Sequence, residues 1–355
     1  MVRVKSLRRK LKVAVLGATG MVGVRSISLL VGHPWFKLKV AAASERSRGM
    51  KLREAVRWIP PQGLSEEILE FEVKSPSPKE LDDVDLVFSA LPSDVAGKIE
   101  EEFARAGFAV FSNASSHRMD RDVPILNPEV NADHAFIVEK QRKRRRWDGF
   151  IVTNPNCTAA VLTLSLKPIL DEFGIRRVLV STMQALSGAG YPGVPSLDIV
   201  DNVIPFIREE EEKVERETLK IMGGPLKPAG FKVSSSCHRV PTIDGHLEAV
   251  FIELKRRVDP SRVAEAMAGF QGEPQRLNLP TAPKPPIIVK GEEDRPQPRL
   301  DRMAGGGMAV VVGRIRSDKG LNGVKYVVLG HNTIRGAAGC SVLNAELLAA
   351  KKLIQ

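Results

Sequence analysis

The residue best suited to covalent chemistry is Cys157, which lies in the stretch "TNPNCTAAVLTLSLKPIL" (153–170). An apolar run precedes this stretch, and apolar residues recur at helical spacing after the cysteine. The pattern predicts a strand, a tight turn and a helix with Cys157 at its N-terminus. Free backbone N–H groups and the positive end of the helix dipole lower a thiol pKa, so we expect a reactive thiolate. A buried structural cysteine is the alternative.

A candidate for proton chemistry stands in "SSSCHRVPTIDGHLEAV", which carries Arg239 and His246. His246 begins an alternating strand, and the turn "IDG" before it projects the imidazole. A thiolate is a good nucleophile and a competent leaving group, so it can hold an acyl group during a two-step transfer. A histidine with a purely structural role is the alternative at this position.

A glycine motif, "GATGMVG", follows the first apolar run and places Gly17, Gly20 and Gly23 before a helix. Gly17 permits a tight turn, Gly20 permits close approach of a diphosphate, and the helix N-terminus binds phosphates. The motif therefore predicts dinucleotide binding, with a plain glycine-rich turn as the alternative.

The choice between NAD and NADP depends on the segment "ASERSRG" at the end of the second expected strand. Ser44, Arg46, Ser47 and Arg48 suit a 2′-phosphate, whereas Glu45 resembles a carboxylate that binds a free ribose. We expect NADP.

Two kinds of sheet are needed to position these residues. Up to about residue 150, apolar strands at 11–20, 36–44, 84–92 and 109–116 alternate with helical patterns, which predicts a doubly wound parallel sheet that binds ligands at its carboxyl edge. After residue 150, the alternation of polar and apolar residues predicts half-buried antiparallel strands. These segments are 176–186, 246–255, 307–318 and 326–332.

The expected fold class is therefore α/β, with a dinucleotide-binding domain at 1–150 and a second, α+β domain with a mainly antiparallel sheet at 151–331. The proline-rich segment 280–302 is expected to be a loop or arm of the second domain. A C-terminal helix, 332–355, is expected to pack back on the first domain.

Composition limits the class of protein. A chain of 355 residues, 43% hydrophobic and 27% charged, is long enough for two globular domains. Its three cysteines, Cys157, Cys237 and Cys340, form no disulfide or zinc spacing, so we expect a reducing cytoplasm and no metal. No apolar run is long enough for a membrane span.

The net charge of +11 is concentrated in "EKQRKRRRWDG" (139–149), for which we expect a solvated loop or a subunit edge. The run lacks the repeated aromatic residues of single-strand binders, so a nucleic-acid partner is not expected. A basic chain also suits small anionic substrates.

Six motifs occur in order along the chain: "GATGMVG", "SNASSHRM", "TNPNCTAA", "QALSGAGYPG", "EEEEKVERETLKI" and "RVPTIDGH". Together they resemble the aspartate-semialdehyde dehydrogenase family, most closely its archaeal and fungal branch, over nearly the whole chain. The resemblance implies NADPH-dependent conversion of L-aspartyl 4-phosphate to L-aspartate 4-semialdehyde through a cysteine thioacyl intermediate, with release of phosphate. It also implies biosynthesis of lysine, by way of diaminopimelate, and of threonine and methionine. A homodimer or homotetramer, joined through a catalytic and dimerisation domain, is implied as well.

The resemblance assigns roles to individual residues. It makes Cys157 the nucleophile, His246 the acid/base and Gln184 the group that orients the intermediate; Asn156 and the Cys157 N–H are candidate oxyanion donors. The implied substrate-binding residues are Arg239 for the carboxylate, Glu210 for the amino group, and Lys213, Arg118 and Asn113 for the phosphate. Glu211 competes with Glu210 because the acidic run leaves the register open. The branch also departs from the bacterial pattern around Arg118.

The glycine motif and the resemblance together predict the NADP contacts. These residues are Gly17, Thr19, Gly20, Met21, Val22, Ser44, Arg46, Ser47, Ser89, Leu91, Pro92, Ser187, Gly188 and Asn332.

Three other functions remain open from the sequence. An NADPH-dependent malonyl-CoA or succinyl-CoA reductase would need the same thiolate. N-acetyl-glutamyl-phosphate reductase shares the chemistry, but Glu210, Lys213 and "QALSGAG" fit it poorly. A non-enzymatic nucleic-acid-binding protein is the alternative of a different class, although the set of Cys157, Gln184, Arg239 and His246 argues against it.

Overall fold

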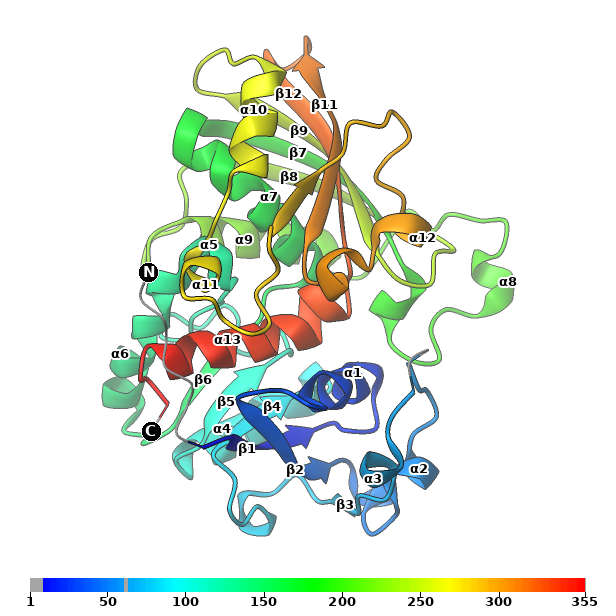
Figure 1. Cartoon of the computed structure of the whole chain (residues 1–355), viewed down its shortest axis with the longest axis vertical. Coiled ribbons are helices and arrows are strands. Elements are labelled where there is room, and N and C mark those ends of the chain that lie inside the picture. Colours follow the sequence, from blue (N-terminus) through cyan, green and yellow to red (C-terminus); the bar gives the residue numbers. More distant parts are fainter. Residues whose placement is uncertain (1–8, 61–62, 355) are drawn as a thin grey trace.

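The computed structural model describes residues 9–60 and 63–354, and two six-stranded sheets dominate it (Figure 1). The first sheet has the strand order β3-β2-β1-β4-β5-β6, and every neighbouring pair is parallel. Its strands are β1 (Leu11–Leu16), β2 (Phe36–Ala42), β3 (Val73–Lys74), β4 (Leu86–Ser89), β5 (Ala109–Ser112) and β6 (Phe150–Thr153). The helices of this part are α1 (Met21–Leu30), α2 (Leu52–Ala55), α3 (Glu66–Leu69), α4 (Ser93–Arg105), α5 (Pro128–Asn131) and α6 (Ile137–Arg145).

The second sheet has the order β10-β11-β12-β9-β7-β8. Its strands are β7 (Ile175–Gln184), β8 (Lys232–Arg239), β9 (His246–Leu254), β10 (Ile287–Val289), β11 (Val310–Asp318) and β12 (Gly323–Gly330). The remaining helices are α7 (Cys157–Phe173), α8 (Ser196–Ile199), α9 (Glu210–Met222), α10 (Pro260–Ala268), α11 (Glu273–Arg276), α12 (Pro298–Asp301) and α13 (Gly339–Ala350). Three ladders are antiparallel, and two, β7 with β8 and β10 with β11, are parallel. The expected fold class is confirmed.

The chain crosses between the two sheets twice, and both crossings matter for the site. β6 pairs with β5 and leads through a short turn into α7, which packs on the second sheet. At the other end of the chain, a π-helical turn (Ile334–Ala338) continues into α13, whose Val342, Leu343 and Leu347 join the core of the first sheet. Figure 1 shows α13, in red, lying between the two sheets.

The basic run at 139–149 is largely helical, so the expected solvated loop is wrong there. α6 ends at Arg145, and the left-handed residue Arg146 follows it. Basic residues stabilise the C-terminal turn of a helix because its unpaired carbonyls carry partial negative charge. Arg145 also pairs with Asp120 and Asp122, both at 2.8 Å.

Two further elements differ from the sequence expectation. β8 was not expected as a strand. It pairs with β7, and most of its side chains are exposed or partly exposed. The proline-rich segment 280–302 holds the short strand β10 and the short helix α12 rather than a simple loop. Among the helices in residues 9–60 and 63–354, none combines the length and apolar character that crossing a bilayer requires.

Candidate active site

Cys157 is the first residue of α7, as the sequence predicts. Asn156 caps this helix, because its side-chain oxygen accepts hydrogen bonds from the backbone N–H groups of Thr158 (2.9 Å) and Ala159 (3.2 Å). Asparagine is among the best N-cap residues because it satisfies donors that have no partner inside the helix. The cap therefore holds the sulfur at the point where β6 of the first sheet passes into the second domain.

The Cys157 sulfur lies 3.2 Å from Nε2 of His246, the first residue of β9. On the other side of the ring, Nδ1 accepts a hydrogen bond from the Ala185 N–H at 3.1 Å. Because Nδ1 is the acceptor, the neutral ring carries its hydrogen on Nε2, facing the sulfur. The Ala185 carbonyl accepts from Arg239 Nη1 at 2.7 Å, so one peptide residue orients both His246 and Arg239.

The Cys157 thiol does not have the lowered pKa that its helix position led us to expect. Burial raises its pKa to about 12, and the nearby Glu210 carboxylate acts in the same direction. Arg239 and Arg118 oppose this rise. The favourable effect of a helix N-terminus, typically ~0.3–1 kcal/mol, is smaller than the cost of burying a charge. Burial also lowers the pKa of His246 well below its usual value, so the resting pair is a thiol and a neutral imidazole.

Glu210 lies at the centre of the hydrogen bonds behind the sulfur. Its Oε2 accepts from the Asn156 side-chain amide at 2.9 Å, and its Oε1 accepts from Gln184 at 3.0 Å and from the Thr158 hydroxyl at 3.2 Å. Glu211 points elsewhere, because its carboxylate accepts from the backbone N–H of Cys237 on β8. The structure therefore brings Glu210, and not Glu211, to the cysteine.

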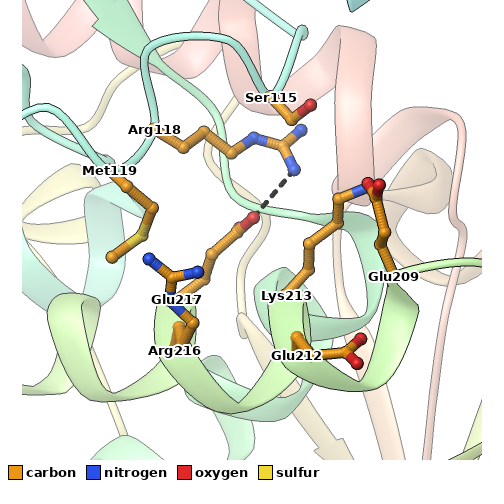
Figure 2. A pocket seen from close by; sticks show the side chains of 8 residues that line it. All are labelled: Ser115, Arg118, Met119, Glu209, Glu212, Lys213, Arg216 and Glu217. Atoms are coloured by element: carbon orange, nitrogen blue, oxygen red, sulfur yellow. Dashed lines mark hydrogen bonds and ion pairs between the residues drawn. The ribbon is translucent and has the colours of Figure 1, made fainter.

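A pocket of about 380 Å³ lies beside these residues, between α9 and the segment that follows β5 (Figure 2). It is lined by Ser115, Arg118, Met119, Glu209, Glu212, Lys213, Arg216 and Glu217. Arg118 is held by Glu217 (3.0 Å) and by the Asn113 carbonyl (2.7 Å). Its Nε is buried without a partner, and Lys213 pairs with Glu209 at 3.1 Å. The lining thus combines three basic side chains, of Arg118, Lys213 and Arg216, with three carboxylates, and the basic side chains are the groups that an anion could contact.

The glycine motif adopts the geometry expected of a dinucleotide-binding turn. Gly17 has a φ of +73°, and a β-carbon there would lie 2.4 Å from the Ala90 carbonyl oxygen. A β-carbon at Gly23 would lie 2.1 Å from the Gly17 oxygen, whereas at Gly20 the nearest atom is 3.5 Å away. The N-terminus of α1 has no side-chain cap, so its N–H groups can bind a diphosphate. These features fit a dinucleotide.

The segment 44–48, which follows β2, has one basic side chain without a carboxylate partner among the described residues, and this favours a 2′-phosphate. Glu45 accepts a hydrogen bond from Ser75 and lies 3.6 Å from Arg48, which also pairs with Glu80 at 2.5 Å. Arg46 is exposed, and no carboxylate pairs with it within residues 9–60 and 63–354. Arg46 is therefore the cation available to an added phosphate.

The other residues expected to contact the cofactor differ in their burial and in whether hydrogen bonds already occupy their polar groups. Asn332 donates to the Ser187 hydroxyl at 2.8 Å and accepts from the Gly245 N–H, next to His246, at 2.9 Å. The Ser89 side chain is fully buried, and its carbonyl accepts hydrogen bonds from both the backbone N–H and the side-chain amide of Asn113, each at 2.9 Å. Thr19, Met21 and Val22 are partly exposed at the turn before and within α1, and Leu91 and Pro92 lead into α4.

Several contributors went unnoticed in the sequence. Thr158 and Ala185 act through hydrogen bonds to residues far away in the sequence. Glu217 and Lys220 belong to the motif "ETLKI", which contributed to the family resemblance, but the sequence assigned them no role of their own. The recurrence of charged residues on one helix face, at 210, 213, 217 and 220, was the available signal. Within the described ranges no group of three or more potential metal ligands is assembled.

Comparisons with known proteins agree with this arrangement. Residues 12–137 match the family model "Semialdehyde dehydrogenase, NAD binding domain", and residues 166–335 match "Semialdehyde dehydrogenase, dimerisation domain". The chain belongs to the semialdehyde dehydrogenase family. Among its relatives is an aspartate-semialdehyde dehydrogenase of Archaeoglobus fulgidus, 58% identical over 96% of this chain and 99% of that protein. The chain is therefore an oxidoreductase of the aspartate-semialdehyde dehydrogenase type, as its motifs imply.

Two further proteins match this chain along nearly its whole length. The malonyl CoA reductase (NADP) of Metallosphaera sedula is 45% identical over 98% of this chain and 99% of that protein. The structure of Candida albicans aspartate-semialdehyde dehydrogenase with NADP has a TM-score of 0.89 and 42% identity, covering 97% of this chain and 100% of that one.

Proposed function

We propose that this family member uses NADPH to convert L-aspartyl 4-phosphate to L-aspartate 4-semialdehyde and phosphate, in the pathway to lysine, threonine and methionine. The observation that carries the proposal is the Cys157 sulfur, which lies 3.2 Å from a histidine and is connected through Asn156 and Glu217 to a pocket that holds Arg118 and Lys213. An acyl phosphate needs both a nucleophile for its carbon and cations for its leaving group. The names of the archaeal and fungal relatives support the same substrate.

In the proposed reaction, the Cys157 sulfur attacks the acyl carbon and forms a C–S bond, while the thiol proton passes to an oxygen of the phosphate group. The C–O bond to phosphate then breaks, and phosphate departs with the electron pair and a proton into the pocket of Arg118 and Lys213. The Nε2–H of His246 donates a hydrogen bond to the sulfur or to the carbonyl oxygen as negative charge gathers there. When the C–S bond breaks, the sulfur leaves with its electron pair and the aldehyde is released.

We assign the substrate's charged groups to the residues on either side of Cys157. Arg239 suits the carboxylate because a guanidinium can pair with both oxygens at once. Glu210 suits the ammonium, since its Oε2 has one donor, Asn156, whereas its Oε1 already has two. Gln184, held by Glu210 and Thr158, orients the acyl group.

NADP is the proposed cofactor, and when bound it supplies or accepts the hydride. The turn at Gly17 and Gly20 with the N-terminus of α1 would hold its diphosphate, and Arg46 its 2′-phosphate. The neighbouring structure with NADP, from Candida albicans, supports this choice. Three free thiols fit the expected reducing cytoplasm.

Acyl-CoA reduction is the second candidate, because a malonyl CoA reductase is among the relatives. The deciding experiment measures NADPH oxidation with aspartyl phosphate and with malonyl-CoA, using wild type and Glu210→Gln. We expect turnover with aspartyl phosphate, reduced at least about tenfold, equivalent to about 1.4 kcal/mol, by Glu210→Gln. Preferred turnover of malonyl-CoA, which has no amino group, with no effect of Glu210→Gln would contradict the proposal.

A homo-oligomer is also proposed. The segment 191–206 around α8 stands out from the second domain (Figure 1). It exposes Leu197 (93% exposed), Phe206 (67%) and Val200 (64%), which together make a surface suited to burial against another subunit. The matching dimerisation-domain model covers this segment.

A further inference from the structure

Two side chains on α9, Glu217 and Lys220, connect the nucleophile's turn with the wall of the anion pocket. They lie one helical turn apart, and so face the same way. Glu217 is only 2% exposed and lines the pocket, as Figure 2 shows. The roles assigned above include neither residue.

The Lys220 ammonium is surrounded by backbone carbonyls of the segment after β5. It donates to the carbonyl oxygens of Arg118 (2.5 Å), Asp120 (2.8 Å) and Val123 (2.9 Å). An ammonium has three N–H donors, and each carbonyl here takes one. The segment 113–123 contains no helix or strand, so side-chain contacts hold it, and Lys220 is one group that joins three of its carbonyls.

The Glu217 carboxylate spans two functional parts of the site. One oxygen accepts from Arg118 Nη1 at 3.0 Å, which is the dashed contact in Figure 2. The other accepts from the backbone N–H of Asn156 at 2.5 Å, immediately before Cys157. A single buried carboxylate therefore connects the Arg118 guanidinium to the backbone next to the sulfur, while the Asn113 carbonyl holds the other guanidinium nitrogen.

We propose that Glu217 and Lys220 are positioning residues, which hold Arg118 at the distance from Cys157 that an acyl phosphate requires. The inference rests on the proposed function, because it assigns Arg118 to the phosphate. Their effect is on geometry, and a misplacement of about 1 Å in such a site can cost about a hundredfold in rate. A purely structural ion pair would instead affect stability without a selective effect on phosphate.

Glu217→Gln tests this directly, because a glutamine has only one accepting oxygen. Either Arg118 or the Asn156 N–H must then face an amide NH₂ group, so one of the two contacts is lost. Glu215→Gln is the matched control: it lies on the same helix, and its carboxylate binds the Ser235 N–H on β8, away from the pocket. Lys220→Met provides an independent second variant, which keeps the test decisive if Glu217→Gln does not fold.

The measurement is the protection of Cys157 from iodoacetamide by inorganic phosphate, in the full-length protein at constant ionic strength. Phosphate on Arg118 would place negative charge near the sulfur, on which Arg118 acts electrostatically, and would raise the pKa of the thiol, so alkylation slows. We expect wild type and Glu215→Gln to be protected with equal dissociation constants, and Glu217→Gln and Lys220→Met to need at least tenfold more phosphate. Melting temperatures, taken alongside, identify a variant that has simply lost its fold.

Equal protection in wild type and the folded variants would overturn the inference, and so would a wild type that phosphate does not protect. Neither outcome depends on turnover. Reduction of aspartyl phosphate by wild type is measured separately, and its absence would count against the proposed function alone. A tenfold loss of kcat/KM for aspartyl phosphate in Glu217→Gln, with unchanged NADPH affinity, would support both.

Discussion

Gly188 offers a sharp test of how closely the site is packed. It lies in the turn Leu186–Ala189, its backbone is outside the left-handed region, and alanine can therefore adopt the same conformation. An added β-carbon would lie 2.7 Å from Arg239 Nη1 and 3.2 Å from His246 Cε1. Carbon and nitrogen do not approach to 2.7 Å without displacement, so the Arg239 guanidinium must move by several tenths of an ångström.

The size of the effect follows from the contact that this movement disturbs. Arg239 Nη1 donates to the Ala185 carbonyl at 2.7 Å, and Ala185 also orients His246. A hydrogen bond to a charged group contributes about 1.5–3 kcal/mol. With a tenfold change in rate for about 1.4 kcal/mol, we expect kcat/KM to fall about 10- to 100-fold in Gly188→Ala.

The assay is steady-state NADPH oxidation with aspartyl phosphate, together with NADPH affinity from fluorescence and the melting temperature. Gly230→Ala is the matched control, since a β-carbon at Gly230 meets no atom within 4 Å. A Gly188→Ala enzyme within about twofold of wild type would refute the reasoning, and a loss confined to NADPH affinity would show that Gly188 matters only as the cofactor contact expected from the sequence.

Three more predictions concern other parts of the molecule. Cys157→Ser should abolish turnover yet keep NADPH binding. In the wild type, iodoacetamide should label Cys157 before Cys237 and Cys340, because those two thiols are fully buried. Equal labelling of the three cysteines in peptide mass spectra would contradict this prediction. Arg46→Ala should lower the ratio of kcat/KM with NADPH to kcat/KM with NADH, by an amount equivalent to about 1.5–3 kcal/mol. Arg48→Ala should lower this ratio less, because Arg48 already pairs with a carboxylate. Burial lowers the pKa of Lys220 to about 8. The folded protein therefore releases this proton at lower pH than the unfolded chain, and the free energy of unfolding should rise with pH from about 8 to 10.5 in wild type relative to Lys220→Met in urea titrations.

The sequence by itself determined those features that depend on neighbours along the chain. The glycine turn before α1, the helix that starts at Cys157 and the alternation of strands with helices follow from local conformational preferences and from burial periodicity. The family followed from the order of its motifs. Asn156 was expected only as an oxyanion donor, although its residue type and its place before Cys157 are typical of a helix cap, which is a contact between residues two or three apart.

Tertiary structure decided whatever depends on residues distant in sequence. The contacts of Asn156 and Gln184 bring Glu210, rather than Glu211, beside Cys157, and the hydrogen on His246 is placed by the backbone of Ala185, 61 residues away. The thiol pKa was predicted wrongly because local reasoning counts the helix dipole but not desolvation, which only the folded surroundings of Cys157 create. Burial is a property of the whole fold, and no short stretch of sequence specifies it.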